Sequence, residues 1–336
     1  MTQPAGILPC QAIEALLQAA AITAETPLAT GQVQPASLDL RLGRRCWRVR
    51  ASFLPGPGRT VAQRLQAVAM HELDLERGAV LERGCVYIAE IQERLALPSG
   101  VAGRGNPKSS TGRLDIFVRL LTDEGRAFDN VASGYAGPLY LEIAPQTFSV
   151  LARTGTRLNQ LRLKRGAPER TGDVTVDVDL TGALAGYRAR RHAGVIDLDI
   201  EGALDPRDFF EALEPRRGEL LLDPGEFYIL ASKQAVEIPL LHAAEMTAID
   251  PAVGEFRAHY AGFFDPGFGL TETGGEGSRA VLEVRSREAP FLLEDGQTVA
   301  RLVFEPMTER PTRAYGDGGS HYQRQDLRLS KHFKAW

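Results

Sequence analysis

Two serines lie between two cations in the stretch GNPKSSTGRLD, which contains Lys108, Ser109, Ser110 and Arg113. The proline and the glycines around them predict a turn, with regular structure resuming near residue 114. Serine hydroxyls, backbone amides of a turn and a guanidinium group are suited to binding phosphate oxygens. The stretch therefore predicts an anion-binding cradle, although a solvated serine-rich turn would have the same composition.

Two further polar clusters stand later in the chain. The sequence FFDPGFG predicts a turn carrying Asp265, and it precedes a predicted strand that carries Glu283. The glycine-rich sequence AYGDGGSHYQRQ, residues 314–325, contains tyrosine, histidine and glutamine side chains near the C-terminus. A segment of this kind is suited to fold over a bound anion as a lid. The alternatives are an ordinary Pro-Gly turn, a solvated strand position and a frayed tail.

The elements that position these clusters form an internal repeat. The sequence LERGCVYIAE at residues 81–90 recurs as LDPGEFYILA at residues 222–231, an offset of 141 residues. The same offset relates LYLEI, with Glu142, to AVLEV, with Glu283, and it also relates two other pairs of segments. An offset held over four separated segments indicates a duplication of one domain.

Each repeat is predicted to be mostly β. Runs such as CVYIAEI, PLYLEI, EFYILA and RAVLEV alternate apolar with polar residues and end at Gly, Pro or Asp. Many short strands of this kind favour a barrel or a jelly-roll sandwich. Residues 9–22, PCQAIEALLQAAAI, predict one helix before the strands. We therefore expect a mainly β chain with a short N-terminal helix and two tandem barrel or jelly-roll domains, residues 1–168 and 169–336.

Composition narrows the functional classes. The chain has 336 residues and a formal net charge of -4, which argues against a dedicated nucleic-acid binder. No apolar run approaches the length of a membrane span, and the first residues lack the plan of a signal peptide. Cys10, Cys46 and Cys85 are isolated and show no metal-ligand spacing. We expect a cytoplasmic protein with reduced thiols and with neither a membrane nor a nucleic-acid partner.

The motifs resemble those of the deoxycytidine triphosphate deaminase branch of the trimeric dUTPase superfamily, over nearly the whole chain. The family motif Arg-Ser-Ser-Leu-Ala-Arg corresponds to residues 108–113, where lysine replaces the first arginine. The family's Asp-Pro-Gly-Trp turn corresponds to residues 265–268, and its Val-Leu-Glu strand to residues 281–283. Its C-terminal tyrosine corresponds to Tyr315, and its Lys-Tyr-x-x-Gln to residues 321–325, where histidine replaces the lysine.

The resemblance implies that each half is a dUTPase-like β-barrel and that the protein is a hydrolase converting dCTP to dUTP and ammonia. It implies catalytic roles for Glu283, Arg113 and Ser109. The substrate-binding residues that it implies are Lys108, Ser109, Ser110, Arg113, Asp265, Val281, Tyr315, His321 and Gln325. It also implies that Mg²⁺ arrives with the triphosphate, without a set of protein ligands.

The two halves retain complementary motifs. The first half keeps the Ser-Ser-x-x-Arg cradle but has DEGRAFDNV where Asp-Pro-Gly is expected. The second keeps Asp265 and Glu283 but has AIDPAVG where the cradle is expected. Because sites in the superfamily combine the cradle of one barrel with the hairpin of its neighbour, we expect a composite site between unlike halves, in one chain or between chains of a homo-oligomer. Glu142 remains a rival base, since it occupies the equivalent strand in the half that keeps the cradle.

These residue types suit hydrolytic deamination. A carboxylate can take a proton from the attacking water and return protons to the ring and to departing ammonia. We expect Arg113 to keep Glu283 ionised and a serine hydroxyl to orient the water. Deaminases that use zinc carry His-x-Glu and Pro-Cys-x-x-Cys sequences, and this chain has neither, so we expect a zinc-free reaction.

Two alternative functions remain open. The nearest is a dUTP diphosphatase, or a bifunctional enzyme that performs both steps. A diphosphatase normally has an aspartate and a tyrosine in its uracil hairpin, where AVLEVRS offers a glutamate. The other alternative is a non-catalytic nucleotide-binding barrel protein, against which the joint presence of serine, arginine, aspartate and glutamate argues.

Overall fold

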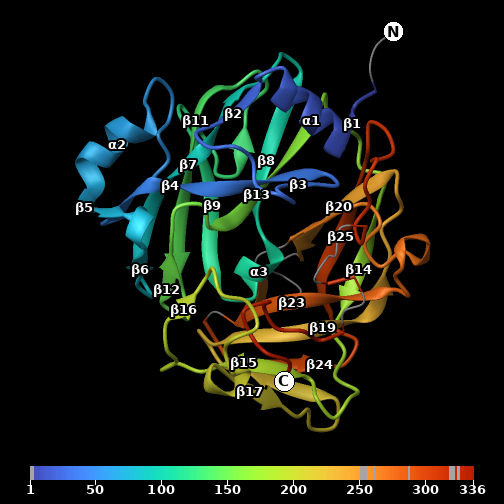
Figure 1. The fold of residues 1–336 in the computed structure, drawn as a ribbon. Coiled ribbons are helices and arrows are strands. Elements are labelled where there is room, and N and C mark those ends of the chain that lie inside the picture. Colours follow the sequence, from blue (N-terminus) through green and yellow to red (C-terminus); the bar gives the residue numbers. More distant parts are fainter. Residues whose placement is uncertain (1–3, 250–255, 260–261, 287, 318–321, 324–325) are drawn as a thin grey trace.

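The computed structural model describes residues 4–249, 256–259, 262–286, 288–317, 322–323 and 326–336. It is mostly β, with barrel-like sheets and a few short helices (Figure 1), which confirms the predicted fold class. No helix in the described part of the chain is long and apolar enough to cross a membrane.

The first half is built around one large sheet. Its main path runs β10-β8-β13-β4-β7-β11-β9, and the end strands β10 and β9 contact each other, so the sheet curls into a barrel. The elements of this half are β1 (Gly6–Ile7), α1 (Cys10–Gln18), β2 (Ile22–Ala24), β3 (Val33–Gln34), β4 (Ser37–Val49), α2 (Val61–Val68), β5 (Ala69–Asp74), η1 (Leu75–Arg77), β6 (Ala79–Leu81), β7 (Val86–Ala96), β8 (Val101–Pro107), α3 (Ser109–Gly112), β9 (Ile116–Thr122), β10 (Asn130–Val131), β11 (Ala136–Pro145), β12 (Val150–Ala152) and β13 (Arg157–Arg165).

The second half contains three smaller sheets, ordered β14-β25-β20-β22, β17-β15-β19-β23-β21 and β18-β24. In Figure 1 these strands occupy the lower and right-hand parts of the molecule. The elements are β14 (Gly172–Asp177), β15 (Gly186–Ala189), β16 (Ile196–Asp197), η2 (Pro206–Asp208), β17 (Phe210–Leu213), β18 (Glu219–Leu222), β19 (Phe227–Val236), β20 (His242–Ala248), β21 (Phe256–His259), β22 (Phe263–Phe264), η4 (Thr271–Thr273), β23 (Ser278–Ser286), β24 (Phe291–Glu294) and β25 (Thr298–Pro306).

The strands of the two halves pair in a register that follows the internal repeat of the sequence. In the first half Tyr87 of β7 pairs with Ile143 of β11, and in the second half Tyr228 of β19 pairs with Val284 of β23. Both partners are therefore shifted by the same 141 residues. Even a side-chain contact repeats: each tyrosine hydroxyl accepts a backbone N–H bond from the residue five positions earlier, at 2.9 Å for Tyr87 and 2.8 Å for Tyr228. The two halves are thus copies of one strand plan.

The predicted N-terminal helix is α1. It buries Cys10 and Ile13 against the barrel, as its apolar spacing predicts. It ends at Gln18, earlier than expected, because Ala20 adopts a left-handed backbone conformation (φ 55°) and β2 begins at Ile22.

The halves pack on one another through a shared core. One buried cluster contains Leu114 and Ile116 of the first half together with Ile229 and Val281 of the second. Strand β16, although it follows β14, pairs in parallel with β12 of the first half. The expected domain boundary at residue 168 lies in the connection between β13 and β14, and we retain it as a proposal about how the chain is divided.

Candidate active site

The cradle and the second-half carboxylates line one cavity within a single chain. Its volume is about 860 Å³. The predicted site residues that line it are Lys108, Ser109, Ser110 and Arg113 from the first half and Asp265, Val281, Glu283 and Tyr315 from the second. His321 and Gln325 lie outside the described residues. The complementary motifs of the two halves therefore meet at one place.

The cradle is a short helix that follows a strand. Strand β8 ends at Pro107, and α3 begins two residues later, so both serines lie in the first turn. The amide of Thr111 donates to the carbonyl of Lys108 at 2.8 Å, which fixes the turn. Ser109 is half-buried and Ser110 is buried, and both border the cavity. Two hydroxyls thus stand at the cavity wall.

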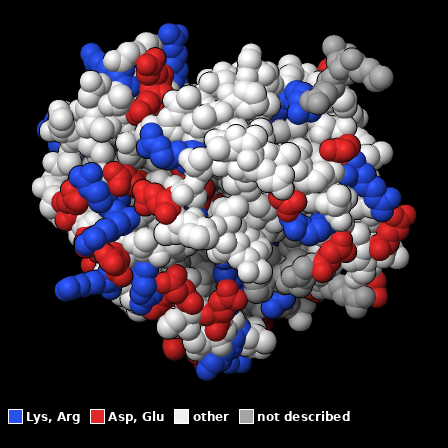
Figure 2. Space-filling view, turned by 45° about the horizontal axis from the view of Figure 1, so that its top comes forward, with Lys and Arg blue, Asp and Glu red and all other residues white. Residues whose placement is uncertain are grey.

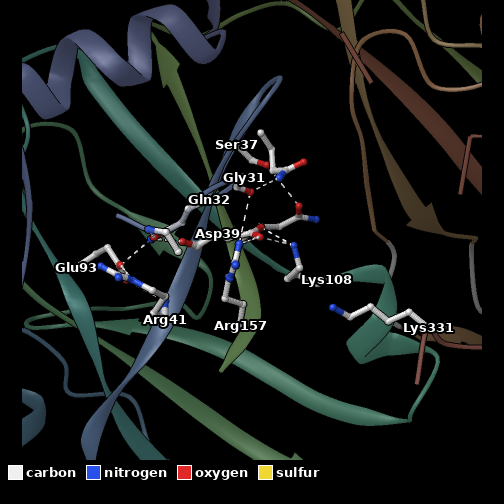
Figure 3. A network of polar contacts seen from close by, with 12 residues as sticks. Gly31, Gln32, Ser37, Asp39, Arg41, Glu93, Lys108, Arg157 and Lys331 are labelled. Atoms are coloured by element: carbon white, nitrogen blue, oxygen red, sulfur yellow. Dashed lines mark hydrogen bonds and ion pairs between the residues drawn. The ribbon is translucent and has the colours of Figure 1, made fainter. Parts of the chain in front are cut away.

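Lys108 is held in place by a buried carboxylate of the first half. Its Nζ lies 2.5 and 2.6 Å from the two carboxylate oxygens of Asp39, which is buried on β4. Arg157, at the start of β13, donates to the same carboxylate at 3.4 Å. Figure 3 shows both cations converging on Asp39. The cavity therefore has a cationic wall whose charges are fixed by a buried anion.

Arg113 connects the halves. Its side chain is buried, and its Nε lies 3.9 Å from Oε1 of Glu283 on β23. The guanidinium carbon stands 4.0 Å from the ring centre of Tyr322, and Nη1 donates to the carbonyl of Arg328 at 3.0 Å. A strand of the second half and two points of the C-terminal segment thus fix the orientation of this cation.

Glu283 is buried to the extent that its acidity changes. Burial raises the pKa of its carboxyl from 4.5 to about 8, and the charge of Arg113 opposes the rise. The expectation that Arg113 keeps Glu283 ionised is therefore wrong near pH 7, because the cost of desolvating the charge exceeds the attraction of Arg113. A carboxyl with a pKa near neutrality can exchange protons with water and with a heterocyclic base in either direction.

Asp265 is positioned by a residue that sequence analysis missed. It lies in a turn closed by the Phe268 amide, which donates to the Asp265 carbonyl at 3.1 Å, and Gly267 supplies the required positive φ of 94°. Arg162 of β13 donates to the Asp265 carboxylate at 3.4 Å, and both side chains are buried. Burial raises the pKa of Asp265, and Arg162 opposes the rise.

The Arg162 side chain extends from the first half into the second. It also donates to the carbonyls of Ala244 at 3.0 Å and Phe264 at 3.2 Å, and it lies 3.9 Å from the ring centre of Phe263. In the sequence RLNQLRLKR, Arg162 stands between two leucines. Because side chains alternate along a strand, this polar position would face solvent in an isolated half. The packing of the second half onto β13 gives it a buried role.

The described residues of the C-terminal segment contact both the cradle and the turn of Asp265, and closure of residues 314–325 over an anion stays a prediction. Ser330 donates its hydroxyl to the carbonyl of Ser110 at 2.8 Å. Gln323 donates to the carbonyl of Gly267 at 2.9 Å, so the segment also holds the turn of Asp265. Tyr315 packs its ring 5.4 Å from that of Phe268. The segment therefore contacts the parts of the site contributed by both halves.

The rival carboxylate Glu142 has a different environment. Arg119 donates its Nε to Glu142 at 2.9 Å, and Ser52 donates its hydroxyl to the other carboxylate oxygen at 2.6 Å. Arg119 in turn lies 3.5 Å from the ring centre of Phe128. Glu142 is absent from the residues that line the cavity. The geometry therefore favours Glu283 as the reacting carboxylate.

No group of three or more His, Cys, Asp or Glu side chains suited to a metal ion occurs among the described residues. Figure 2 shows Lys and Arg interspersed with Asp and Glu on the face that it presents, without an extended basic surface there.

Curated relatives share part of the chain. A protein of Coprothermobacter proteolyticus described as "dCTP deaminase, dUMP-forming" is 29% identical over 120 residues, 35% of this chain and 60% of that protein. A protein of Halobacterium salinarum with the same description is 33% identical over 113 residues, 32% of this chain and 53% of that protein. The matched region thus spans little more than half the length of each of these relatives.

A solved structure and two family models match far more of the chain. The crystal structure of 2'-deoxycytidine 5'-triphosphate deaminase from Agrobacterium tumefaciens has 52% sequence identity and a TM-score of 0.86, covering 90% of this chain and 99% of that one. The models for the N-terminal and C-terminal domains of 2'-deoxycytidine 5'-triphosphate deaminase match residues 4–167 and 151–333. The chain therefore belongs to the 2'-deoxycytidine 5'-triphosphate deaminase family.

Proposed function

We propose that this protein deaminates dCTP to dUTP and ammonia, in a site that each chain builds from both of its halves. The observation that carries the proposal is the buried Glu283 beside Arg113, on the wall of the cavity that the serine cradle also lines. A carboxyl with a pKa of about 8 is matched to proton transfer near neutral pH. Family membership supplies the substrate class, and this pair supplies the acid–base chemistry.

The reaction needs two protons to be moved from one water molecule. Ionised Glu283 takes the first proton as the water oxygen bonds to C4 of cytosine, and it passes that proton to N3. It then takes the proton of the new hydroxyl and gives it to the exocyclic amine. The C4–nitrogen bond breaks, ammonia leaves and a carbonyl forms at C4. Glu283 ends in its starting state, so one carboxylate is sufficient.

The other residues are assigned by their place around the cavity. Arg113 is fixed beside Glu283 and favours its ionised form. Ser109 supplies a hydroxyl suited to orient the water, and Asp265 stands at a turn suited to bind the sugar. Lys108 and Ser110 also line the cavity, and an ammonium and a hydroxyl group are suited to bind phosphate oxygens. Tyr315 and Val281 complete the wall, and we extend the assignment to His321 and Gln325 from the family motif alone.

Magnesium is proposed to enter with the nucleotide. The carboxylate of Asp39, which binds Lys108 of the cradle, is also paired with Arg157. Its geometry supports a wall that attracts phosphate rather than a ready-made set of oxygen ligands for a metal. Mg²⁺ would be held mostly by phosphate oxygens and would partly neutralise their charge. We likewise retain a zinc-free reaction, a cytoplasmic location and a homo-oligomer as proposals.

A second product is suggested by the names of the relatives. Both curated proteins cited above are described as forming dUMP, which requires hydrolysis of the triphosphate after deamination. We favour dUTP as the product because the solved structure that matches this chain over 99% of its own length is described as a 2'-deoxycytidine 5'-triphosphate deaminase, without formation of dUMP. The alternative product, dUMP, is distinguished in the same assay.

The test is product analysis with purified protein. Incubation with dCTP, dUTP and CTP, each with Mg²⁺, is followed by chromatography of nucleotides and by an ammonia assay. Ammonia and dUTP in equal amounts from dCTP support the proposal. Accumulation of dUMP and pyrophosphate supports the bifunctional alternative. Binding of dCTP without turnover would show a nucleotide-binding protein, and loss of activity on removal of tightly bound zinc would contradict the zinc-free reaction.

A further inference from the structure

A second ion pair joins the same two elements that carry Arg113 and Glu283. Asp115 follows Arg113 by two residues, and Arg285 follows Glu283 by two residues. The Arg285 Nη2 donates to Oδ2 of Asp115, so the charges are reversed relative to the first pair. Arg285 lies on β23, where residues two apart share a face. Two opposed ion pairs therefore link the first half to the second at neighbouring points.

Asp115 is built into the end of the cradle. Its backbone is left-handed (φ 55°), a conformation that Asp and Asn tolerate better than most residues with a Cβ. Its amide donates to the Gly112 carbonyl at 2.9 Å, and its carbonyl accepts from the Gln146 amide at 2.9 Å. The Thr147 hydroxyl donates to the same carboxylate oxygen that binds Arg285. The carboxylate of Asp115 therefore has little freedom to move.

The Arg285 side chain is likewise held by several hydrogen bonds. Its Nη2 also donates to the Thr147 hydroxyl at 3.1 Å, and its Nη1 donates to the carbonyl of Gly225. The side chain of Arg285 is 19% exposed, and that of Asp115 is 1% exposed. Neither residue lines the cavity. A hydrogen-bonded pair outside the cavity, with a buried carboxylate and a half-buried guanidinium, is suited to hold the two elements in place.

We propose that Asp115 and Arg285 are positioning residues that set the separation between Arg113 and Glu283; the assignment rests on the proposed function. Strand β9 after the cradle is bonded to β11, and β23 is bonded to β19 and β21, so each element is held in its own sheet. The relative position of the two sheets is then fixed by contacts between side chains. Arg285 stands two residues after Glu283 on the same face of β23, so the Asp115–Arg285 pair lies next to the Arg113–Glu283 pair. A small displacement of the first pair would therefore change the separation of the second.

The consequence concerns the ionisation of Glu283. Attraction between opposite charges falls as they separate. A longer distance between Arg113 and Glu283 therefore weakens the attraction that offsets the cost of burying the charged Glu283 carboxylate. The other titratable side chains around the cavity include Asp39, Lys108, Asp265, Tyr315, Tyr322 and His332. On β19 the residue opposite Glu283 is the apolar Ile229, and on β21 the backbone partner is His259. Among the residues that the structure describes, Arg113 is the cation that pairs with Glu283.

The test compares two neutralised carboxylates. D115N keeps the size of the side chain and suits the left-handed backbone, but it removes the charge that holds Arg285. E245Q is the matched control, because Glu245 is a buried carboxylate in another ion pair between the halves, with Arg104 at 3.0 Å, and does not line the cavity. The readouts are kcat and KM for dCTP, the pH profile of kcat/KM, and thermal unfolding.

We expect D115N to lower kcat by about 10-fold or more, since small misplacements of reacting groups have effects of this size, with KM changed less than about 3-fold. In D115N the acid limb of the kcat/KM profile should move to higher pH. E245Q should leave kcat and the pH profile unchanged. R285M should reproduce the changes of D115N, and the double variant should be no worse than the single ones. A D115N protein that is merely less stable, with the kcat and pH profile of wild type, overturns the proposal.

A readout without turnover separates this inference from the proposed function. Titration of the Glu283 carboxyl by ¹³C NMR, assigned by its loss in E283Q, should show a higher pKa in D115N than in wild type or E245Q. Wild-type protein that fails to deaminate dCTP contradicts the function, whereas an unchanged Glu283 titration in D115N contradicts the positioning role.

Discussion

Glu142 and Glu283 occupy the same place in two copies of one strand pair, opposite Ile88 and Ile229, but they have different environments. Glu283 borders the cavity beside Arg113, whereas Glu142 is bonded to Arg119 and Ser52. The two halves thus carry equivalent carboxylates, and the packing of the halves gives them different environments.

The first prediction compares the two glutamates. E283Q keeps the shape of the side chain but removes the base, so kcat for dCTP should fall by about 10²–10⁴-fold while KM changes little. E142Q should leave kcat within about 3-fold of wild type, because that side chain is outside the cavity. Steady-state kinetics with both purified variants tests this. An inactive E142Q together with a near-normal E283Q would identify Glu142 as the base.

The second prediction concerns the pH dependence of activity. The profile of kcat/KM reports groups of the free enzyme, and ionised Glu283 is required to accept the proton of water. Its pKa of about 8 predicts that kcat/KM for dCTP rises with pH through this region. Initial rates at subsaturating dCTP between pH 5.5 and pH 9.5 provide the measurement, with buffers of constant ionic strength. A flat profile around pH 8 would show that another group limits the reaction.

The third prediction concerns the pH dependence of stability. The folded pKa of Glu283 is raised above the unfolded value of 4.5, so between pH 4.5 and about 8 the folded state binds the extra proton. The contribution of this group to stability is therefore complete below pH 4.5 and is lost as pH rises through 8, at up to about 1.4 kcal/mol per pH unit. E283Q lacks the effect. Denaturant unfolding at several pH values should show a steeper decline for wild type than for E283Q, and equal slopes would contradict the assignment.

The fourth prediction concerns the buried pair of Arg162 and Asp265. Removing the arginine leaves a buried carboxylate without its partner, so R162Q should lower the free energy of unfolding by about 3–5 kcal/mol. R313Q removes another cation between the halves, but Arg313 and its partner Glu14 are 51% and 40% exposed, and the loss should stay below about 1 kcal/mol. Urea denaturation of the two variants decides the matter. Similar losses for both would show that Arg162 has no special role in joining the halves.

Much of this organisation follows from sequence patterns that are local. The repeat of 141 residues predicts the equivalence of Glu142 and Glu283, since strand pairing preserves register within each copy. The alternating strands and the Pro-Gly turn predict the elements on which the cradle and Asp265 stand. The choice between the two glutamates is different, because it depends on which face each half turns toward the other.

The roles of Arg162 and Arg285, which the sequence did not indicate, also depend on how the halves pack together. Arg162 and Arg285 alternate with apolar neighbours on their strands and resemble solvated positions in an isolated half. Their roles arise from packing between the halves, which no local pattern records. The raised pKa of Glu283 has a related cause: the sequence suggests an arginine neighbour but does not reveal the depth of burial that outweighs it.

Placing the cradle and Glu283 on one polypeptide also changes how their encounter depends on the amount of protein. A site divided between separate subunits is lost when dilution drives those subunits apart. Here the described parts of the site are covalently tethered, so their effective local concentration is set by the chain itself. The described parts of the site are therefore brought together by folding of one chain rather than by association of separate chains.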